Sequence, residues 1–174
     1  FLMRIAAISG GVAVRLGPSL TLMRGHTMSD NPATQALPQA QVEQLRARLA
    51  RAAFAGTLGG FRLLDVQRGR ARIGFHADSR HQQGGGIVQG GIIATLADST
   101  MAFSVMSLTA DDHPVVTIEM KVNFLAPVSE DDLIGEGWVL HEGKRTLVCE
   151  CEVRNARGKL VAKALSTFIR MKKG

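Results

Sequence analysis

One acid stands alone in a long apolar stretch of this sequence. Asp98 is the only charged residue between Ile87 and Ala110, where the other residues are apolar or small and uncharged, apart from Gln89. Moving an ionised carboxylate out of water costs far more free energy than the surrounding apolar packing returns. Such an acid is therefore paired, protonated or used in chemistry, and Asp98 is the first candidate for a reactive group. The alternative is a buried carboxylate that only caps a neighbouring loop.

A glycine-rich segment, residues 83–91, leads up to this acid. If a helix begins here, Gly90 and Gly91 leave free backbone N–H groups at its positive end, with no side chain to block a ligand. Such donors suit a carbonyl oxygen on which negative charge develops. The alternative is a turn that needs glycine only for a positive φ or for tight packing. Standard nucleotide-binding patterns do not match, because Gln89 stands where a dinucleotide fingerprint needs glycine and no Gly-Lys-Ser/Thr follows.

The elements that must position these residues follow from the spacing of the apolar side chains. Residues 90–107 are apolar on nearly every side, which predicts a helix that the rest of the fold buries. Residues 41–55 combine apolar residues at helical spacing with arginines on the other side, which predicts an amphipathic surface helix. Alternating or turn-bounded runs predict strands at 61–66, 70–76, 115–128, 133–141, 144–155 and 159–170. This order predicts an α+β domain in which strands curl around one buried helix, and not a Rossmann-type alternation.

Length and charge limit the classes of protein that fit. The 174 residues suit one domain with a full core. The net charge of +6 is uneven, because the first 29 residues contain three arginines and no acid, which leaves about +3 on the rest. With no tyrosine and one tryptophan, that excess does not match a nucleic-acid-binding surface. The central apolar run contains an acid and several Ser and Thr residues, so we expect no membrane span.

The cysteines and histidines show no metal-site spacing, so we expect no bound metal. Cys149 and Cys151 would point to the same face of one strand, which is a poor geometry for a disulfide. Reduced, buried thiols indicate a cytoplasmic protein.

The N-terminal segment is expected to lie outside the fold. Its apolar pieces are interrupted by Arg4 and Arg15 and are too short for a signal-peptide core or a membrane span. An organelle transit peptide and an upstream extension both fit the arginine-rich, acid-free composition before Met28. We expect residues 1–38 to be a poorly ordered extension and residues 39–174 to form the domain.

The combination of these motifs resembles the signature of hot-dog-fold acyl-CoA thioesterases of the phenylacetate-degradation type. The matching residues lie in the glycine-rich segment and in the helix after it: Gln83, Gly86, Gln89, Gly90, Gly91, Leu96 and Asp98. The resemblance continues through three later segments, at 116–128, 143–146 and 158–162. It covers about residues 40–170, which is nearly all of the expected domain.

The resemblance implies a hot-dog fold, in which a curved antiparallel sheet wraps around a central buried helix at residues 90–107. It also implies a homodimer or a dimer of dimers, with each active site at a subunit interface. Asp98 of one chain would then face the 83–89 loop of its partner, which would explain an acid on an otherwise apolar helix.

The activity implied is hydrolysis of the thioester of an aryl- or short- to medium-chain acyl-CoA, to free acid and CoA. Asp98 would act as general base on water or as nucleophile, and the Gly91 N–H, helped by Gln89, would polarise the carbonyl. Thr117 matches a family position that places the water or the acid. The other expected site residues are Gln83, in the position of a family asparagine, and three substrate contacts: Gly90, Lys144 and Arg145. CoA is part of the substrate, so no cofactor is implied.

Two departures from the family pattern keep other functions open. Family members usually have histidine and asparagine where this chain has Gln89 and Gln83. Glutamine can donate a hydrogen bond but cannot become cationic or relay a proton. One alternative is a hot-dog acyl-CoA hydratase or dehydratase, although that chemistry normally pairs the acid with a histidine. The other is a non-catalytic acyl-CoA-binding module.

Overall fold

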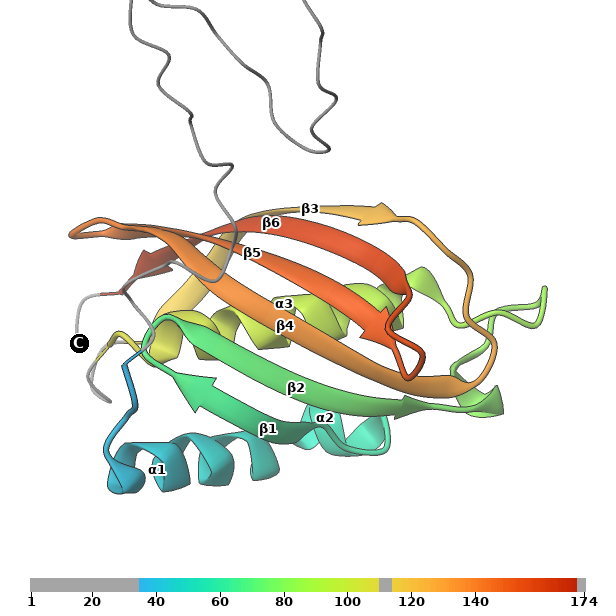
Figure 1. The fold of residues 1–174 in the computed structure, drawn as a ribbon, viewed down its shortest axis with the longest axis horizontal. Coiled ribbons are helices and arrows are strands. Elements are labelled where there is room, and N and C mark those ends of the chain that lie inside the picture. The colour runs from blue at the N-terminus through green and yellow to red at the C-terminus, as the bar shows by residue number, and fades with distance from the viewer. Residues whose placement is uncertain (1–34, 110–113, 172–174) are drawn as a thin grey trace, which may run out of the picture. The chain divides into compact units, whose positions relative to one another are not determined.

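The computed structural model describes residues 35–109 and 114–171 of the chain. Two short helices precede two strands, a long helix follows, and four more strands complete the domain (Figure 1). Their bounds are α1 Gln39–Ala50, α2 Ala53–Thr57, β1 Arg62–Gln67, β2 Arg70–Ala77, α3 Gly90–Met106, β3 Val115–Phe124, β4 Asp131–Glu142, β5 Thr146–Asn155 and β6 Leu160–Arg170. A turn of 3-10 helix, Ser79–His81, lies between β2 and α3.

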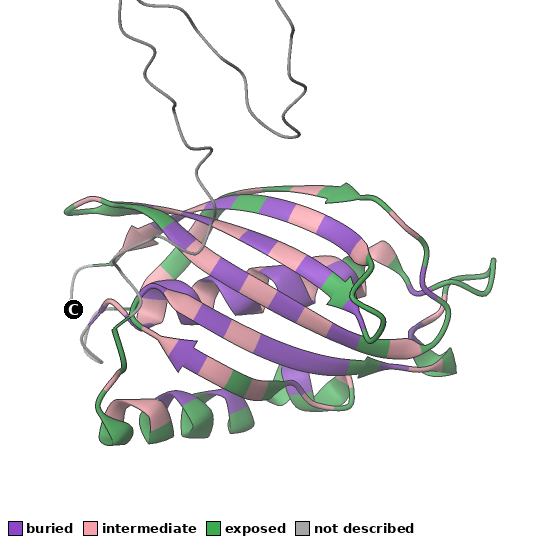
Figure 2. Ribbon diagram, in the orientation of Figure 1, coloured by how far each residue is buried: buried purple, intermediate pink, exposed green. Residues whose placement is uncertain are grey.

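The strands form one antiparallel sheet in the order β1-β2-β4-β5-β6-β3. Its inner face curves around α3, which packs against every strand of the sheet (Figure 1). Burial alternates along the strands, as in β5, where the buried residues are Leu147, Cys149, Cys151, Val153 and Asn155 (Figure 2). A period of two is what a strand with one buried face requires. The predicted α+β fold, with a curved antiparallel sheet around a central helix, is confirmed.

The close approach of α3 to the middle of the sheet depends on two glycines of β4. A Cβ on Gly135 would collide with the hydroxyl of Thr100, and a Cβ on Gly137 would lie 2.7 Å from Oγ of Ser104. Both hydroxyls are satisfied within the helix, because Thr100 donates to the Leu96 carbonyl at 2.7 Å and Ser104 to the Thr100 carbonyl at 3.0 Å. The absence of side chains on the strand therefore lets the helix lie against it.

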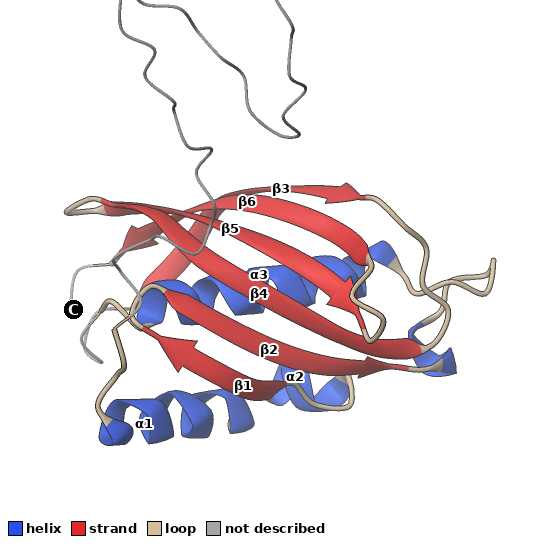
Figure 3. Cartoon of the chain, viewed as in Figure 1, coloured by secondary structure: helices blue, strands red, loops and turns tan. Residues whose placement is uncertain are grey.

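The N-terminal elements differ in part from the prediction (Figure 3). The helix expected at 41–55 is divided in two, because Ala52 adopts an extended backbone between α1 and α2. The extension expected at 1–38 lies mostly outside the described residues. Its described end contacts the domain, where the Arg68 N–H donates to the Gln35 carbonyl at 2.8 Å.

The strand expected at 115–128 is shorter and less regular than predicted. β3 ends at Phe124, and the chain then leaves the sheet to lie against the glycine-rich loop. A bulge between Thr117 and Glu119 shifts the alternation of side chains that the sequence indicates. Thr117 consequently points toward α3, while Ile118 is 56% exposed.

Candidate functional site

Asp98 lies near the middle of α3, beside Thr117 at the start of β3. The Thr117 hydroxyl donates a hydrogen bond of 2.8 Å to Oδ1 of Asp98. Oδ2 of the same carboxylate receives no hydrogen bond from the described residues. The acid is therefore held at one oxygen and free to react at the other.

Asp98 is only half-buried, because it lies between β3 and the face of α3 that the sheet leaves uncovered. That face carries small, incompletely buried residues: Gly91, Ala94, Thr95 and Ala102. Met101 and Val105, which lie at helical spacing from Asp98, are instead fully buried. The helix thus has a second face, made of small residues, that the described chain leaves uncovered.

The glycine-rich loop is tied to the domain through its backbone. The Gln89 N–H donates to the His81 carbonyl at 2.8 Å, and the Val88 N–H donates to the Val128 carbonyl at 2.7 Å. These bonds anchor the residue that immediately precedes α3, and so fix where the helix begins.

Gly90 and Gly91 are the first residues of α3, and neither has a positive φ. A Cβ on Gly90 would lie 3.1 Å from the ring of Phe124, so packing explains the glycine at that position. A Cβ on Gly91 would meet only Cγ of Gln89, at 4.0 Å. Neither backbone conformation nor space within the described chain requires glycine at 91. Because Gln89 makes no side-chain capping bond either, the Gly91 N–H is open to a ligand.

A pocket of about 300 Å³ opens beside this loop. Its lining includes three of the predicted site residues and two apolar residues at and after the end of β3: Gln83, Gln89, Gly90, Phe124 and Leu125. Asp98 and Thr117 are not part of the lining. Within one chain, the pocket therefore gathers loop residues and not the acid.

The predicted site residues fall into three groups in the structure. Asp98 is seven residues beyond Gly91, which places it about 10 Å further along the helix axis. Lys144 and Arg145 belong to the β4–β5 turn, where the Arg145 carbonyl accepts the Arg170 N–H at 2.8 Å. The end of β6 pairs with the start of β3, so this turn lies at the opposite end of the sheet from the glycine-rich loop.

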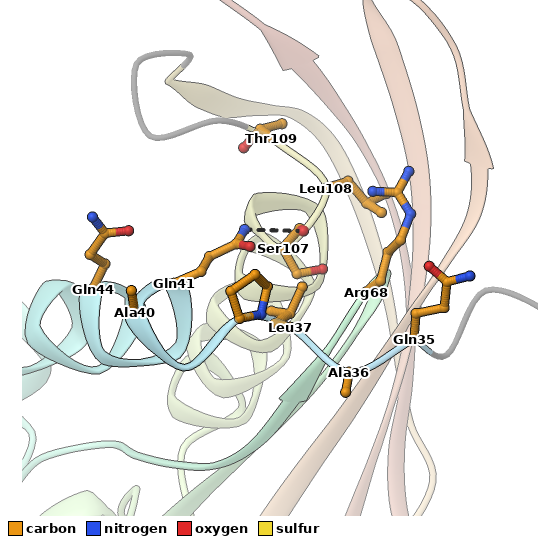
Figure 4. A pocket seen from close by; sticks show the side chains of 11 residues that line it. Gln35, Ala36, Leu37, Ala40, Gln41, Gln44, Arg68, Ser107, Leu108 and Thr109 are labelled. Carbon is orange, nitrogen blue, oxygen red and sulfur yellow. Dashed lines mark hydrogen bonds between the residues drawn. The ribbon is translucent and has the colours of Figure 1, made fainter.

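A larger pocket, of about 600 Å³, lies between the start of α1, the β1–β2 turn and the end of α3 (Figure 4). The side-chain amide of Gln41 crosses it and donates to the Ser107 carbonyl at 3.3 Å, the dashed line in Figure 4. The Ser107 hydroxyl is already used, because it accepts the Gly69 N–H at 2.7 Å. None of the described lining residues is an acid or a predicted site residue, so this pocket is not the candidate site.

Comparison with known proteins identifies the family. The sequence profile of the Thioesterase superfamily matches residues 85–162. A protein of Saccharolobus solfataricus, provisionally named an esterase, is 33% identical over 107 residues, which are 62% of this chain and 76% of that protein. The chain belongs to the thioesterase superfamily. Human acyl-coenzyme A thioesterase 13 is 27% identical over 135 residues, 75% of this chain and 94% of that protein. The structure of the E. coli PaaI protein, from the phenylacetic acid degradation operon, matches with a TM-score of 0.72 at 24% sequence identity. The match covers 79% of this chain and 98% of the PaaI chain, and it confirms the hot-dog fold.

As a member of the thioesterase superfamily, the chain is a thioester hydrolase. Such a reaction needs a group that activates water or attacks the carbonyl, and donors that stabilise the oxyanion. Asp98 is the one described candidate for the first task on α3, and the N–H groups at the helix start suit the second.

His81 helps to hold the glycine-rich loop of this thioesterase-superfamily chain in place, although no sequence motif marks it as a site residue. His81 is buried, with Nε2 2.8 Å from the Leu58 carbonyl, and Nδ1 accepts the Asp78 N–H at 3.0 Å. Its own carbonyl accepts the Gln89 N–H. The Arg80 guanidinium, hydrogen-bonded to Asp78, holds the pKa of that carboxyl well below its usual range. A histidine just ahead of the loop was the only sequence signal, and alone it does not indicate this role.

Neither cysteine belongs to the site. Cys149 and Cys151 are free thiols, fully buried on the inner face of β5. Burial raises the pKa of Cys151 to about 12 and that of Cys149 further still, so neither is a nucleophile near neutral pH. The described residues contain no cluster of three His, Cys, Asp or Glu side chains that could hold a metal. No described helix is long and apolar enough to span a membrane.

Proposed function

We propose that the chain hydrolyses the thioester of an aryl- or short- to medium-chain acyl-CoA, releasing the free acid and CoA. The main support for this proposal is the Asp98–Thr117 pair. The Thr117 hydroxyl orients the carboxylate through Oδ1, and Oδ2 accepts no hydrogen bond from the described residues. The name of the human relative, an acyl-coenzyme A thioesterase, supports CoA as the leaving group.

A second copy of the chain completes the site in this proposal. β3 is an edge strand, so its outward N–H and C=O groups have no partner among the described strands. Val116 and Ile118 on this strand are 47% and 56% exposed, and the uncovered face of α3 lies close by. Antiparallel pairing of two β3 strands would join the sheets of two copies in a symmetric dimer.

Such pairing would place the end of one β3 beside the start of the other. The glycine-rich loop adjoins the end of β3, and Asp98 adjoins the start through Thr117. The loop of one copy would therefore face the acid of the other, although the two groups are separated within one chain. The β4–β5 turn also lies at the start of β3, so Lys144 and Arg145 would reach the same side as contacts for CoA phosphates.

The site residues would divide the reaction between them. The Gly91 N–H and the Gln89 side-chain amide would donate to the carbonyl oxygen of the thioester as negative charge develops on it. Gln83 would help to hold this carbonyl from the same loop, and Gly90 would leave the backbone accessible to the substrate.

Asp98 has two routes to the product. As general base it would take a proton from water while the water oxygen attacks the carbonyl carbon, after which the C–S bond breaks and the CoA thiolate takes up a proton. As nucleophile, a carboxylate oxygen would attack the carbonyl, expel the CoA thiolate and form a mixed anhydride, which water then hydrolyses.

Thiol release from a panel of aryl-, short- and medium-chain acyl-CoAs tests the proposal. The wild type should release CoA, and Asp98→Asn should be slower by about a hundredfold or more at an unchanged circular dichroism spectrum. Gln89→Ala should lose less activity, and Gln89→His should raise it, because imidazole can also carry positive charge. A fully active Asp98→Asn variant would exclude the role of this acid. Hydration of an unsaturated acyl-CoA without thiol release would instead identify a hydratase, and binding without turnover a non-catalytic module.

A further inference from the structure

We infer that the turn between β5 and β6, residues 155–159, binds the phosphate groups of the substrate through Arg157 and Lys159. This inference rests on the proposed function, because it assigns a place to the nucleotide end of an acyl-CoA. The phosphates of CoA lie at the far end of an uncharged arm from the thioester, so the groups that bind them lie outside the reacting site.

The backbone of this turn is fixed before any ligand binds. The side-chain oxygen of the buried Asn155 accepts the N–H groups of Arg157 and Lys159, at 3.2 and 3.0 Å. The Gly158 N–H donates to the Asn155 carbonyl at 2.8 Å, and Gly158 has a φ of +77°, which favours glycine. A turn that is already ordered loses little conformational freedom on binding.

The two cations of the turn are free to bind an anion. Arg157 and Lys159 are exposed and form no ion pair with a described residue. Their basic neighbours differ, since Arg154 is bonded to Glu152 at 2.6 Å and Lys163 is also paired with acids. Exposed guanidinium and ammonium groups without a carboxylate partner are suited to phosphate.

The turn stands beside the pocket at the glycine-rich loop. Leu125 and Ala126 line that pocket, and their N–H groups donate to the Val161 carbonyl at 2.8 and 3.2 Å, just beyond Lys159 in the chain. The apolar part of the lining suits an uncharged arm. The substrate would therefore run from the helix start, through this pocket, to the cations of the turn.

This assignment is separate from the one for Lys144 and Arg145. Those residues lie at the other end of the sheet and would reach the same substrate only from a second copy of the chain. The β5–β6 turn lies at the same end as the loop of its own chain. The two basic pairs can therefore be tested independently in one protein.

Steady-state kinetics with an acyl-CoA, and with the same acyl group on pantetheine, which lacks the phosphates, test the inference. Arg157→Gln/Lys159→Gln should raise KM for the acyl-CoA about tenfold or more and change kcat by less than about twofold. KM for the acyl-pantetheine should not change. Added salt should weaken acyl-CoA binding less in this variant than in the wild type. An unchanged KM for the acyl-CoA, or an equal rise for both substrates, would overturn the inference.

Arg48→Gln/Arg51→Gln is the matched control, since it removes two exposed charges at the C-terminal end of α1, a helix that packs against β1 at the edge of the sheet opposite to β3. A similar rise of KM in this control would show an effect of net charge and would also overturn the inference. A chain that hydrolyses neither substrate would contradict the proposed function. Calorimetry with CoA would then test the phosphate-binding inference separately, by comparing CoA binding in the wild type and the variant. Weaker CoA binding by Arg157→Gln/Lys159→Gln supports the inference, while equal binding, or none by the wild type, overturns it.

Discussion

The Thr117 hydroxyl lies 2.8 Å from Oδ1 of Asp98, so a residue of β3 orients a carboxylate of α3. The bulge between Thr117 and Glu119 allows this contact. Met120 faces inward, so in a regular strand Thr117, three residues earlier, would face the outer side of the sheet. A local irregularity of one strand therefore sets the geometry of the candidate acid.

Replacing Thr117 tests the importance of this bond. Thr117→Val keeps the shape of the side chain and removes the donor, so kcat for thiol release should fall about tenfold, as for a lost hydrogen bond to a charged group. Thr117→Ser keeps the hydroxyl and should stay within about threefold of the wild type. Initial rates at saturating acyl-CoA give the comparison. Equal rates for the two variants would show that the hydroxyl does not orient the acid.

Gly91→Ala tests whether this glycine is needed for catalysis and not for the stability of α3. A Cβ has space at this position, and alanine favours a helix over glycine by up to about 1 kcal/mol, so the melting temperature should not fall. The methyl group would crowd the proposed carbonyl site, so kcat/KM should fall about tenfold or more. Gly56→Ala, at an exposed helical glycine with nothing within 4 Å of a Cβ, is the control and should keep full activity. An equally active Gly91→Ala variant would show that the substrate carbonyl does not approach this residue closely, and would contradict its proposed position.

Much of the fold can be predicted from the sequence, because the pattern of apolar side chains is regular. β5 is expected at 144–155 and observed at Thr146–Asn155, since its inward-facing residues up to Val153 are all apolar or cysteine. α3 is expected at 90–107 and observed at Gly90–Met106, because an unbroken apolar run of that length fits a buried helix.

The candidate site is less accessible to sequence reasoning, for reasons that the structure makes plain. The bulge beside Thr117 contains no glycine or proline that would mark it. The contacts of His81 join Leu58, Asp78 and Gln89, and no local pattern shows that these segments meet. The acid and the loop lie apart within one chain, and in the proposed dimer they meet only across the two copies.

A mixture of two impaired variants tests whether two copies share each site. In a mixed dimer of Asp98→Asn and Gly91→Ala chains, one site carries both substitutions and the other carries neither. After co-expression in equal amounts, about a quarter of wild-type activity should return, because half of the dimers are mixed and each has one intact site. Each variant expressed alone provides the baseline. No recovery would place the acid and the loop of the same chain in one site.

Gly135→Ala should destabilise the domain, since its Cβ would collide with the Thr100 hydroxyl between β4 and α3. We expect the free energy of unfolding to fall by about 1–3 kcal/mol, the usual cost of overpacking a core. Adding Thr100→Ala should recover part of this loss, because it removes the colliding atom. Urea unfolding of the wild type, the two single variants and the double variant gives the coupling energy. Additive losses would show that this contact is not the cause.

The buried thiols should make stability depend on alkaline pH. Burial raises the pKa of Cys151 from its ordinary value of 9.0 to about 12, and raises that of Cys149 further, so the folded state keeps both thiols neutral where the unfolded chain ionises them. The free energy of unfolding should therefore gain its full thiol contribution below pH 9.0 and lose it as pH rises toward 12. Each thiol should add a slope of up to about 1.4 kcal/mol per pH unit.

Urea unfolding between neutral and alkaline pH, compared with Cys149→Ala/Cys151→Ala, isolates this slope from other titrating groups. The double variant should be less stable at neutral pH, because it leaves small cavities, and should lose less stability above pH 9.0. Parallel curves for the two proteins would mean that the thiols ionise in the folded state as readily as in the unfolded chain, and that β5 does not keep them from water.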